Sequence, residues 1–148
     1  MRFPLGSAVL DAAARLLAPV ILLFAVYVVA HGHDSPGGGF QGGVLFAAGL
    51  ILVKLTHGGP GRWEIGTGAA LSLACVGVAV FAGIGLVAVA YGGNYLDYAA
   101  PPLLKDPVAE RVIGTLGIEI GVALAVAGVI LLVFDALAGG DDQEQEPS

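Results

Sequence analysis

Residues 112–134 read VIGTLGIEIGVALAVAGVILLVF, and this stretch determines the class of fold. A helix needs about 20 consecutive apolar residues to cross the hydrocarbon core of a bilayer. The stretch reaches that length with one charged residue, Glu119, and it contains no proline that would break a helix. It therefore predicts a membrane-spanning helix, which we extend to residues 107–137.

Three further segments are long and apolar enough to span a membrane, and clusters of helix breakers separate them. These segments are residues 8–30, 36–55 and 65–90. We therefore predict an all-α integral membrane protein with about four transmembrane helices, in one domain over residues 1–137. Residues 138–148 end in DDQEQEPS, and we expect them to form an acidic, disordered tail.

The composition supports a membrane protein and excludes several other classes. The chain is 57% hydrophobic and 12% charged, whereas soluble domains are about 45–50% apolar and about 25% charged. Its six Lys and Arg residues are spread along the chain without a basic patch, which excludes nucleic acid as a partner. The single cysteine, Cys75, lies in an apolar run, and we expect it to be a buried small residue.

The first segment is interpreted as a retained helix, and the distribution of basic residues predicts its orientation. Asp11 and Arg15 interrupt its start, and no small-residue cleavage site follows, which argues against a signal peptide. Basic residues favour the cytoplasmic side. Arg2, Arg15, Lys54 and Arg62 lie on the side of the termini, and Lys105 and Arg111 lie on the other. We therefore predict a multi-pass protein of the cell membrane with both termini in the cytoplasm.

Residues 31–43, HGHDSPGGGFQGG, open the second predicted helix and are rich in glycine. Gly38 with Gly42, and Gly39 with Gly43, form two overlapping pairs at the four-residue spacing that lets helices approach closely in membranes. A phosphate-binding loop is the other interpretation, but no Gly-Lys-Ser/Thr follows. The pattern therefore predicts close helix packing.

Three polar residues, His31, His33 and Asp34, precede these glycines at a predicted membrane edge. They are either ordinary residues of a hydrated loop or an entrance for protons or cations, since histidine titrates near neutral pH. A zinc site is disfavoured because zinc needs four firmly spaced ligands and Cys75 is too deep in the membrane. The sequence leaves the first two interpretations open and predicts no metal.

Glu119 is the second candidate for a role in an ion path. A charge near the bilayer centre costs about 2.5–3.5 kcal/mol and normally faces protein or water. Gly117 and Gly121 bracket Glu119 and share one helix face, while Glu119 points roughly the other way. We expect the glycine face to pack on one neighbour and Glu119 to meet a different partner or a polar cavity. A protonated or paired structural carboxyl is the alternative.

The sequence contains no nucleophile–base pair, paired carboxylates or cofactor fingerprint. We therefore predict no catalytic site and no cofactor.

The glycine-rich stretch resembles the MnhB/MrpB family, which supplies a small subunit of the Mrp-type multisubunit sodium/proton antiporters. In that family a Gly-His-x-x-Pro-Gly-Gly-Gly-Phe-x-Gly-Gly pattern follows the first helix, and the last helix carries an acidic residue followed closely by Gly-Val. Glu119, Gly121 and Val122 are similar to the second feature. The residues that match the first are Gly32, His33, Pro36, Gly37, Gly38, Gly39, Phe40, Gly42 and Gly43.

The resemblance implies a function that the composition alone does not. It implies a small, cofactor-free membrane subunit of a sodium(cation)/proton antiporter, with large complex I-like antiporter subunits as partners in the bilayer. Glu119, with His31, His33 and Asp34 at the entrance, would then lie on the path of sodium ions or protons. Two alternatives stay open: a purely structural packing subunit, and a same-family subunit of an ion-pumping redox complex such as a membrane-bound hydrogenase.

Overall fold

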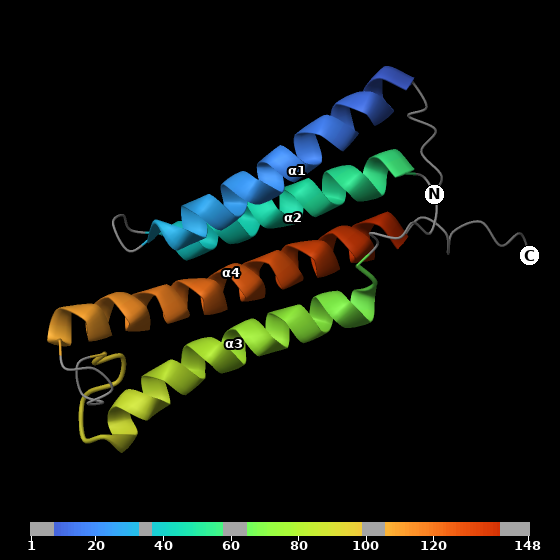
Figure 1. The fold of residues 1–148 in the computed structure, drawn as a ribbon. Helices are drawn as coiled ribbons and strands as arrows, with labels where there is room; N and C mark the ends of the chain where they lie inside the picture. The colour runs from blue at the N-terminus through green and yellow to red at the C-terminus, as the bar shows by residue number, and fades with distance from the viewer. Residues whose placement is uncertain (1–7, 33–36, 58–64, 99–105, 140–148) are drawn as a thin grey trace, which may run out of the picture.

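The described part of the protein forms four long helices, and Figure 1 shows their arrangement in the computed structural model. The structure describes residues 8–32, 37–57, 65–98 and 106–139. All four helices are long and apolar enough to cross a membrane, which confirms the predicted fold class. The helices are α1 (Ala8–Ala30), α2 (Gly38–His57), α3 (Thr67–Ala90) and α4 (Pro107–Gly139). Their bounds lie within two residues of the predicted ones.

The helices form two antiparallel hairpins that meet along a parallel pair. The helices α1 and α2 form one hairpin, and α3 and α4 form the other. The helix α2 packs on α4, so the spatial order is α1, α2, α4, α3 (Figure 1). The start of α1 and the end of α4 lie at the same end of the molecule (Figure 1). This arrangement fits termini on one side of the membrane, and their cytoplasmic location stays a prediction.

Glycine and alanine bring the helices of each hairpin close together. In the first hairpin, a β-carbon on Gly42 would lie 3.0 Å from the Ala25 carbonyl oxygen. In the second hairpin, a β-carbon on Gly128 would lie 2.6 Å from the Ala70 carbonyl oxygen. Such backbone contact is the usual basis of helix association in membranes, where the apolar lipid gives no hydrophobic drive.

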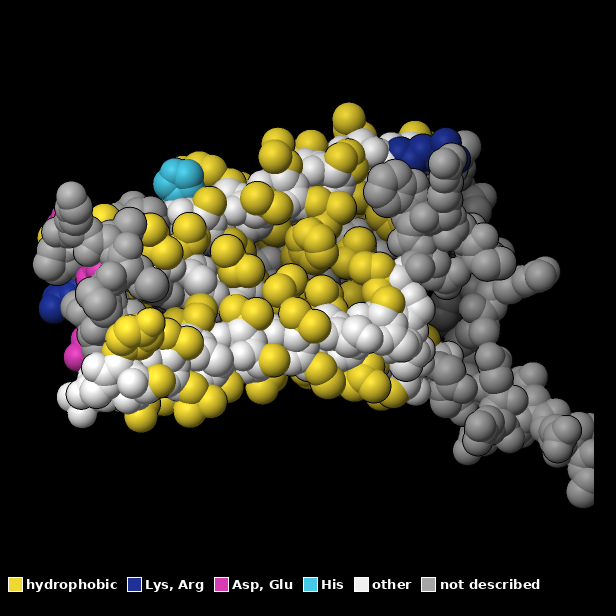
Figure 2. Space-filling view, turned by 60° about the horizontal axis from the view of Figure 1, so that its bottom comes forward, with side chains coloured by type: hydrophobic (Ala, Val, Ile, Leu, Met, Phe, Trp, Pro, Cys, Tyr) yellow, Lys and Arg dark blue, Asp and Glu magenta, His cyan; other side chains and the backbone are white. Residues whose placement is uncertain are grey.

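Large apolar side chains point away from the seams and cover the outside of the molecule. Figure 2 shows them over the middle of one face, with charged side chains at its two ends. Leu16 and Leu23 of α1 are 70% and 73% exposed, and Leu86 of α3 is 62% exposed. Such a surface suits lipid or a neighbouring membrane subunit.

The expectation that Cys75 is buried is wrong. Cys75 is exposed on α3, because α3 lies at the edge of the row of helices and packs on α4 alone among the described helices. An apolar sequence environment indicates burial in a soluble protein. In a membrane helix it is equally compatible with a side that faces lipid.

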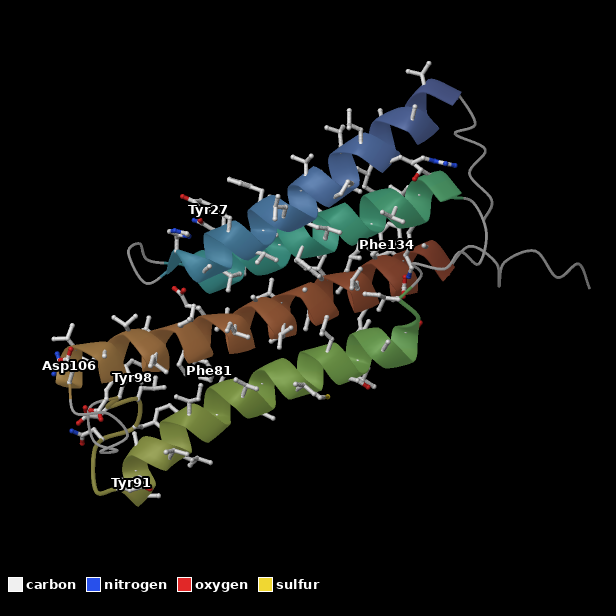
Figure 3. All side chains as sticks on the ribbon, in the orientation of Figure 1. Tyr27, Phe81, Tyr91, Tyr98, Asp106 and Phe134 are labelled. Carbon is white, nitrogen blue, oxygen red and sulfur yellow. The ribbon has the colours of Figure 1, made fainter. Side chains whose placement is uncertain are left out.

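Side chains at one end of the second hairpin fix the start of α4. The Asp106 Oδ1 accepts a hydrogen bond from the Val108 backbone N–H at 3.0 Å, with Pro107 as the first helical residue. Asp106 is therefore the N-cap of α4. The ring of Tyr98 lies against Gly114 of α4. Figure 3 shows Tyr98 and Asp106 at the same end of the molecule, with Phe134 towards the other.

Candidate ion site at the α2–α4 seam

Glu119 lies on α4 where the two hairpins meet, and it is 9% exposed. Its carboxyl group lies against Gly32, which follows α1, so that a β-carbon on Gly32 would collide with the carboxyl oxygens. Its backbone lies against Gly39 of α2, where a β-carbon would be 2.8 Å from the Glu119 Cα. Gly32 leaves the room that the carboxyl occupies, and Gly39 lets the backbones of α2 and α4 approach closely. The first hairpin therefore supplies the wall of the site, and α4 supplies the acid.

The two faces of α4 near Glu119 meet different helices, as the sequence predicts. A β-carbon on Gly117 would lie 2.7 Å from Ile84 Cδ1 of α3. A β-carbon on Gly121 would lie 3.1 Å from the Phe81 backbone nitrogen, also on α3. The glycine face thus packs inside the second hairpin, and Glu119 is directed towards the first.

The glycines that open α2 also divide between two neighbours. Gly38 and Gly42 face α1, where a β-carbon on Gly38 would lie 3.2 Å from the Val28 carbonyl oxygen. Gly39 and Gly43 face α4, where a β-carbon on Gly43 would lie 3.0 Å from the Ala123 Cα. One overlapping motif therefore serves two interfaces at once.

The structure describes two further members of the predicted motif, Gly37 and Phe40. Gly37 has a φ of 98°, which favours glycine over any other residue. Phe40 is 58% exposed and points away from the seams. Pro36 lies outside the described residues.

The predicted entrance residues are described only in part. His33 and Asp34 lie outside the described residues. His31 is exposed; its Nδ1 lies 3.1 Å from the Tyr27 carbonyl oxygen, and its ring stacks on the Tyr27 ring at 4.2 Å. These contacts hold His31 against the end of α1. The structure therefore brings Glu119 together with Gly32 and Gly39, whereas His31 is held by Tyr27.

The sequence does not predict the charged contact at the opposite end of the seam. Lys54 of α2 forms an ion pair with Asp135 of α4, with 2.5 Å between Nζ and Oδ1. The two side chains are 13% and 17% exposed. The Thr67 hydroxyl of α3 lies 3.5 Å from the other Asp135 oxygen. Each charge ends an apolar run in the sequence, and only the parallel packing of α2 on α4 brings them together.

The described residues offer little else for binding chemistry. No group of three or more His, Cys, Asp or Glu side chains among them could hold a metal ion. In the α3–α4 loop, burial raises the pKa of Tyr98 above its usual 10.0, and the neighbouring Tyr95 raises it further. A raised pKa keeps this tyrosine neutral, which suits a packing role.

Comparison with known proteins places the chain among antiporter subunits. Residues 9–132 match the model of a domain related to the MnhB subunit of Na+/H+ antiporter. A Staphylococcus haemolyticus protein named "Putative antiporter subunit mnhB2" is 32% identical over 137 residues, which are 91% of this chain and 96% of the relative. A protein of the same name from Staphylococcus aureus (strain Newman) is 28% identical over 136 residues, with the same two coverages. No solved structure gives a significant match.

Proposed function

Because the chain belongs to the family of domains related to the MnhB subunit of Na+/H+ antiporters, we propose that Glu119 lies on the path of the exchanged cation or proton. The chain is a small, multi-pass membrane subunit of a multisubunit sodium/proton antiporter, in a family of transporters rather than enzymes. Its partners are therefore the other subunits of that complex. The role of Glu119 is the part that needs a test.

The single observation that supports this proposal is the position of the Glu119 carboxyl. It is almost fully buried and far inside an apolar helix, and it lies against glycine where two hairpins meet. A carboxyl in the membrane is costly and normally serves an ion path or a paired structural role. It can bind a cation as a carboxylate and carry a proton as an acid, which are the two chemistries that a sodium/proton exchanger needs.

His33 and Asp34 complete the proposed path as its entrance. They follow Gly32 directly in the sequence, and Gly32 contacts the Glu119 carboxyl. A histidine that titrates near neutral pH next to a fixed negative charge would attract cations and pass protons. We place His31 at the outer edge of the same entrance. We also propose that this chain itself has no catalytic site and no cofactor.

Exchange in membrane vesicles tests the role of Glu119. We expect Glu119→Gln, which keeps the shape and removes the charge, to abolish sodium/proton exchange while the complex assembles in normal amounts. The control is Asp97→Asn, which removes an exposed carboxylate from the α3–α4 loop and should leave exchange unchanged. Full exchange by an assembled Glu119→Gln complex would show that the proposal is wrong.

A purely structural role is the second candidate, and the glycine seams favour it. Each glycine pair at the start of α2 contacts a different helix, so this segment acts as a packing centre. If packing is its whole function, Glu119→Gln will be silent and bulky substitutions at Gly39 will prevent assembly.

Affinity purification identifies the partners. We propose large complex I-like antiporter subunits as the neighbours of this chain in the bilayer, with sodium ions and protons as the transported species. A tag on the C-terminal tail, extraction in mild detergent and mass spectrometry should recover these subunits. Recovery of iron–sulfur or nickel proteins instead would support the redox-driven alternative, to which the names of the matched relatives give no support.

A further inference from the structure

We propose that the ion pair between Lys54 and Asp135 fixes the register of α2 on α4, and that it thereby positions Glu119 at the other end of the seam. The importance of that position rests on the proposed function of Glu119. The register itself does not depend on it.

The α2–α4 seam alone specifies its register weakly. On α2, small residues recur every four positions at Gly39, Gly43 and Ala47, and on α4 Ala123 and Ala127 follow Glu119 at the same spacing. The contacts Gly39–Glu119 and Gly43–Ala123 have a constant offset along the two parallel chains. A slip by one such step moves the helices by about 6 Å. In one direction it brings Gly43 opposite Glu119 and Ala47 opposite Ala123, so that small residues again meet along the seam.

The ion pair removes this ambiguity. A slip that brings Gly43 opposite Glu119 also brings Lys54 opposite Leu131, an apolar residue that is 0% exposed. Lys54 and Asp135 would then be separated while still largely buried, and uncompensated buried charges are strongly unfavourable. A polar contact at a single position is known to specify register in helix pairs at some cost in stability.

The register matters for Glu119 because the two hairpins are joined mainly by α2 and α4. The wall of the site, Gly32 and Gly39, belongs to the first hairpin, and the carboxyl belongs to the second. Asp135 lies sixteen residues after Glu119, about 24 Å along the helix axis. A slip at the ion pair would thus carry Glu119 past its glycine wall.

Disulfide cross-linking within the assembled antiporter in native membranes reports the register. In a Cys75→Ala background, Ala47→Cys is combined with Ala127→Cys for the native register, since Ala47 and Ala127 belong to one buried cluster. Ala47→Cys with Ala123→Cys, and Ala47→Cys with Leu131→Cys, report slips of one turn in either direction. Cysteines displaced by one turn exceed the distance that a disulfide can bridge.

We expect the native pair alone to cross-link when Lys54 and Asp135 are intact. Lys54→Ala should shift cross-linking from the native pair to a slipped pair and lower exchange. Two variants should show both the native cross-link and normal exchange. They are Lys54→Arg and the charge-swapped double variant Lys54→Asp with Asp135→Lys. A purely structural loss of stability would lower the amount of complex without producing slipped cross-links.

Native cross-linking in an assembled Lys54→Ala complex would overturn the proposal. If Lys54→Ala does not accumulate, the charge-swapped variant is the test. The proposal predicts that this variant accumulates with the native cross-link, and its failure to do so would also overturn the proposal. Exchange retained in Glu119→Gln would remove the ion-path proposal and leave the cross-linking result standing, so the two failures are distinguishable.

Discussion

The two ends of the α2–α4 seam surround an acidic side chain of α4 in different ways. At one end, the Glu119 carboxyl lies against the backbone of Gly32. At the other, Asp135 meets the ammonium group of Lys54 directly. The carboxyl of Glu119 thus lies beside a glycine that follows α1, whereas the carboxylate of Asp135 meets a lysine of α2.

We propose that this difference corresponds to two functions within one interface. A carboxylate paired with lysine is stabilised as an anion and is suited to holding two helices in place. The Glu119 carboxyl lies so close to Gly32 that a change in the backbone or side chain at that position should move it. We therefore propose that Glu119 reacts at one end of the seam while Lys54 and Asp135 hold the helices together at the other, and variants at each end can test this.

The largest effect is expected from Gly39→Leu. A β-carbon at Gly39 would lie 2.5 Å from the Glu119 carbonyl oxygen, so a leucine would force α2 and α4 apart. We expect loss of assembly, measured as the amount of complex recovered with a tagged subunit. Gly83→Leu is the control because a β-carbon at Gly83 meets nothing within 4 Å. Recovery of intact complex with Gly39→Leu would show that the seam does not need this contact.

Gly32→Ala should affect assembly less than Gly39→Leu does, but it should strongly reduce exchange. One methyl group would occupy the place of the Glu119 carboxyl and displace it from the glycine wall. Sodium/proton exchange per assembled complex should fall severely, because a small displacement of a reacting group is costly. Gly66→Ala, in open space at the start of α3, should behave like the unchanged protein. Equal exchange by both variants would contradict the assigned geometry.

Removal of the cap on α4 should have a moderate effect on stability. Asp106→Ala loses the hydrogen bond from the Val108 N–H, and loss of an N-cap typically costs about 1 kcal/mol. We expect a lower thermal midpoint for the purified complex, with Asp106→Asn close to the unchanged protein because asparagine also caps. If alanine and asparagine give the same midpoint, the cap does not contribute.

The smallest effect concerns Tyr98 at alkaline pH. Because its pKa is raised in the folded protein, its contribution to stability is complete below pH 10.0, the ordinary value of tyrosine, and is lost as the pH rises through the folded pKa. Above pH 10.0 the unchanged protein should therefore lose stability relative to Tyr98→Phe. Below pH 10.0 the difference in stability between the two proteins should stay constant. Thermal unfolding of both proteins across this range checks the sign, and a parallel response would argue against burial of the hydroxyl.

The sequence predicts the helices well because membrane spans are long and leave little ambiguity. It also predicts that the face of Gly117 and Gly121 is separate from Glu119, since helix periodicity alone determines this. It does not predict the order of helices in space, because every span has an apolar surface on several sides. The error over Cys75 has this origin, since no pattern indicates that α3 would pack on α4 alone among the described helices.

The sequence does not predict the ion pair for a related reason. Lys54 and Asp135 are 81 residues apart in sequence, and each looks like an ordinary charge at a membrane edge. Their pairing depends on α2 and α4 being parallel neighbours, which local sequence does not encode. The sequence likewise predicts close packing by the glycines at the start of α2, but it does not predict that Gly32 and Gly39 lie against Glu119. Packing in general was predictable, whereas the particular partners were not.

Infrared difference spectroscopy of the assembled complex can show whether Glu119 takes part in exchange. Spectra are recorded on acidification and on addition of sodium, and those of Glu119→Gln are subtracted from those of the unchanged protein. The expected result is a carboxylic acid signal that changes with protons or sodium and is absent in the variant. Identical difference spectra for the two proteins would show that the Glu119 carboxyl neither takes up a proton nor responds to sodium, and would contradict its place on the ion path.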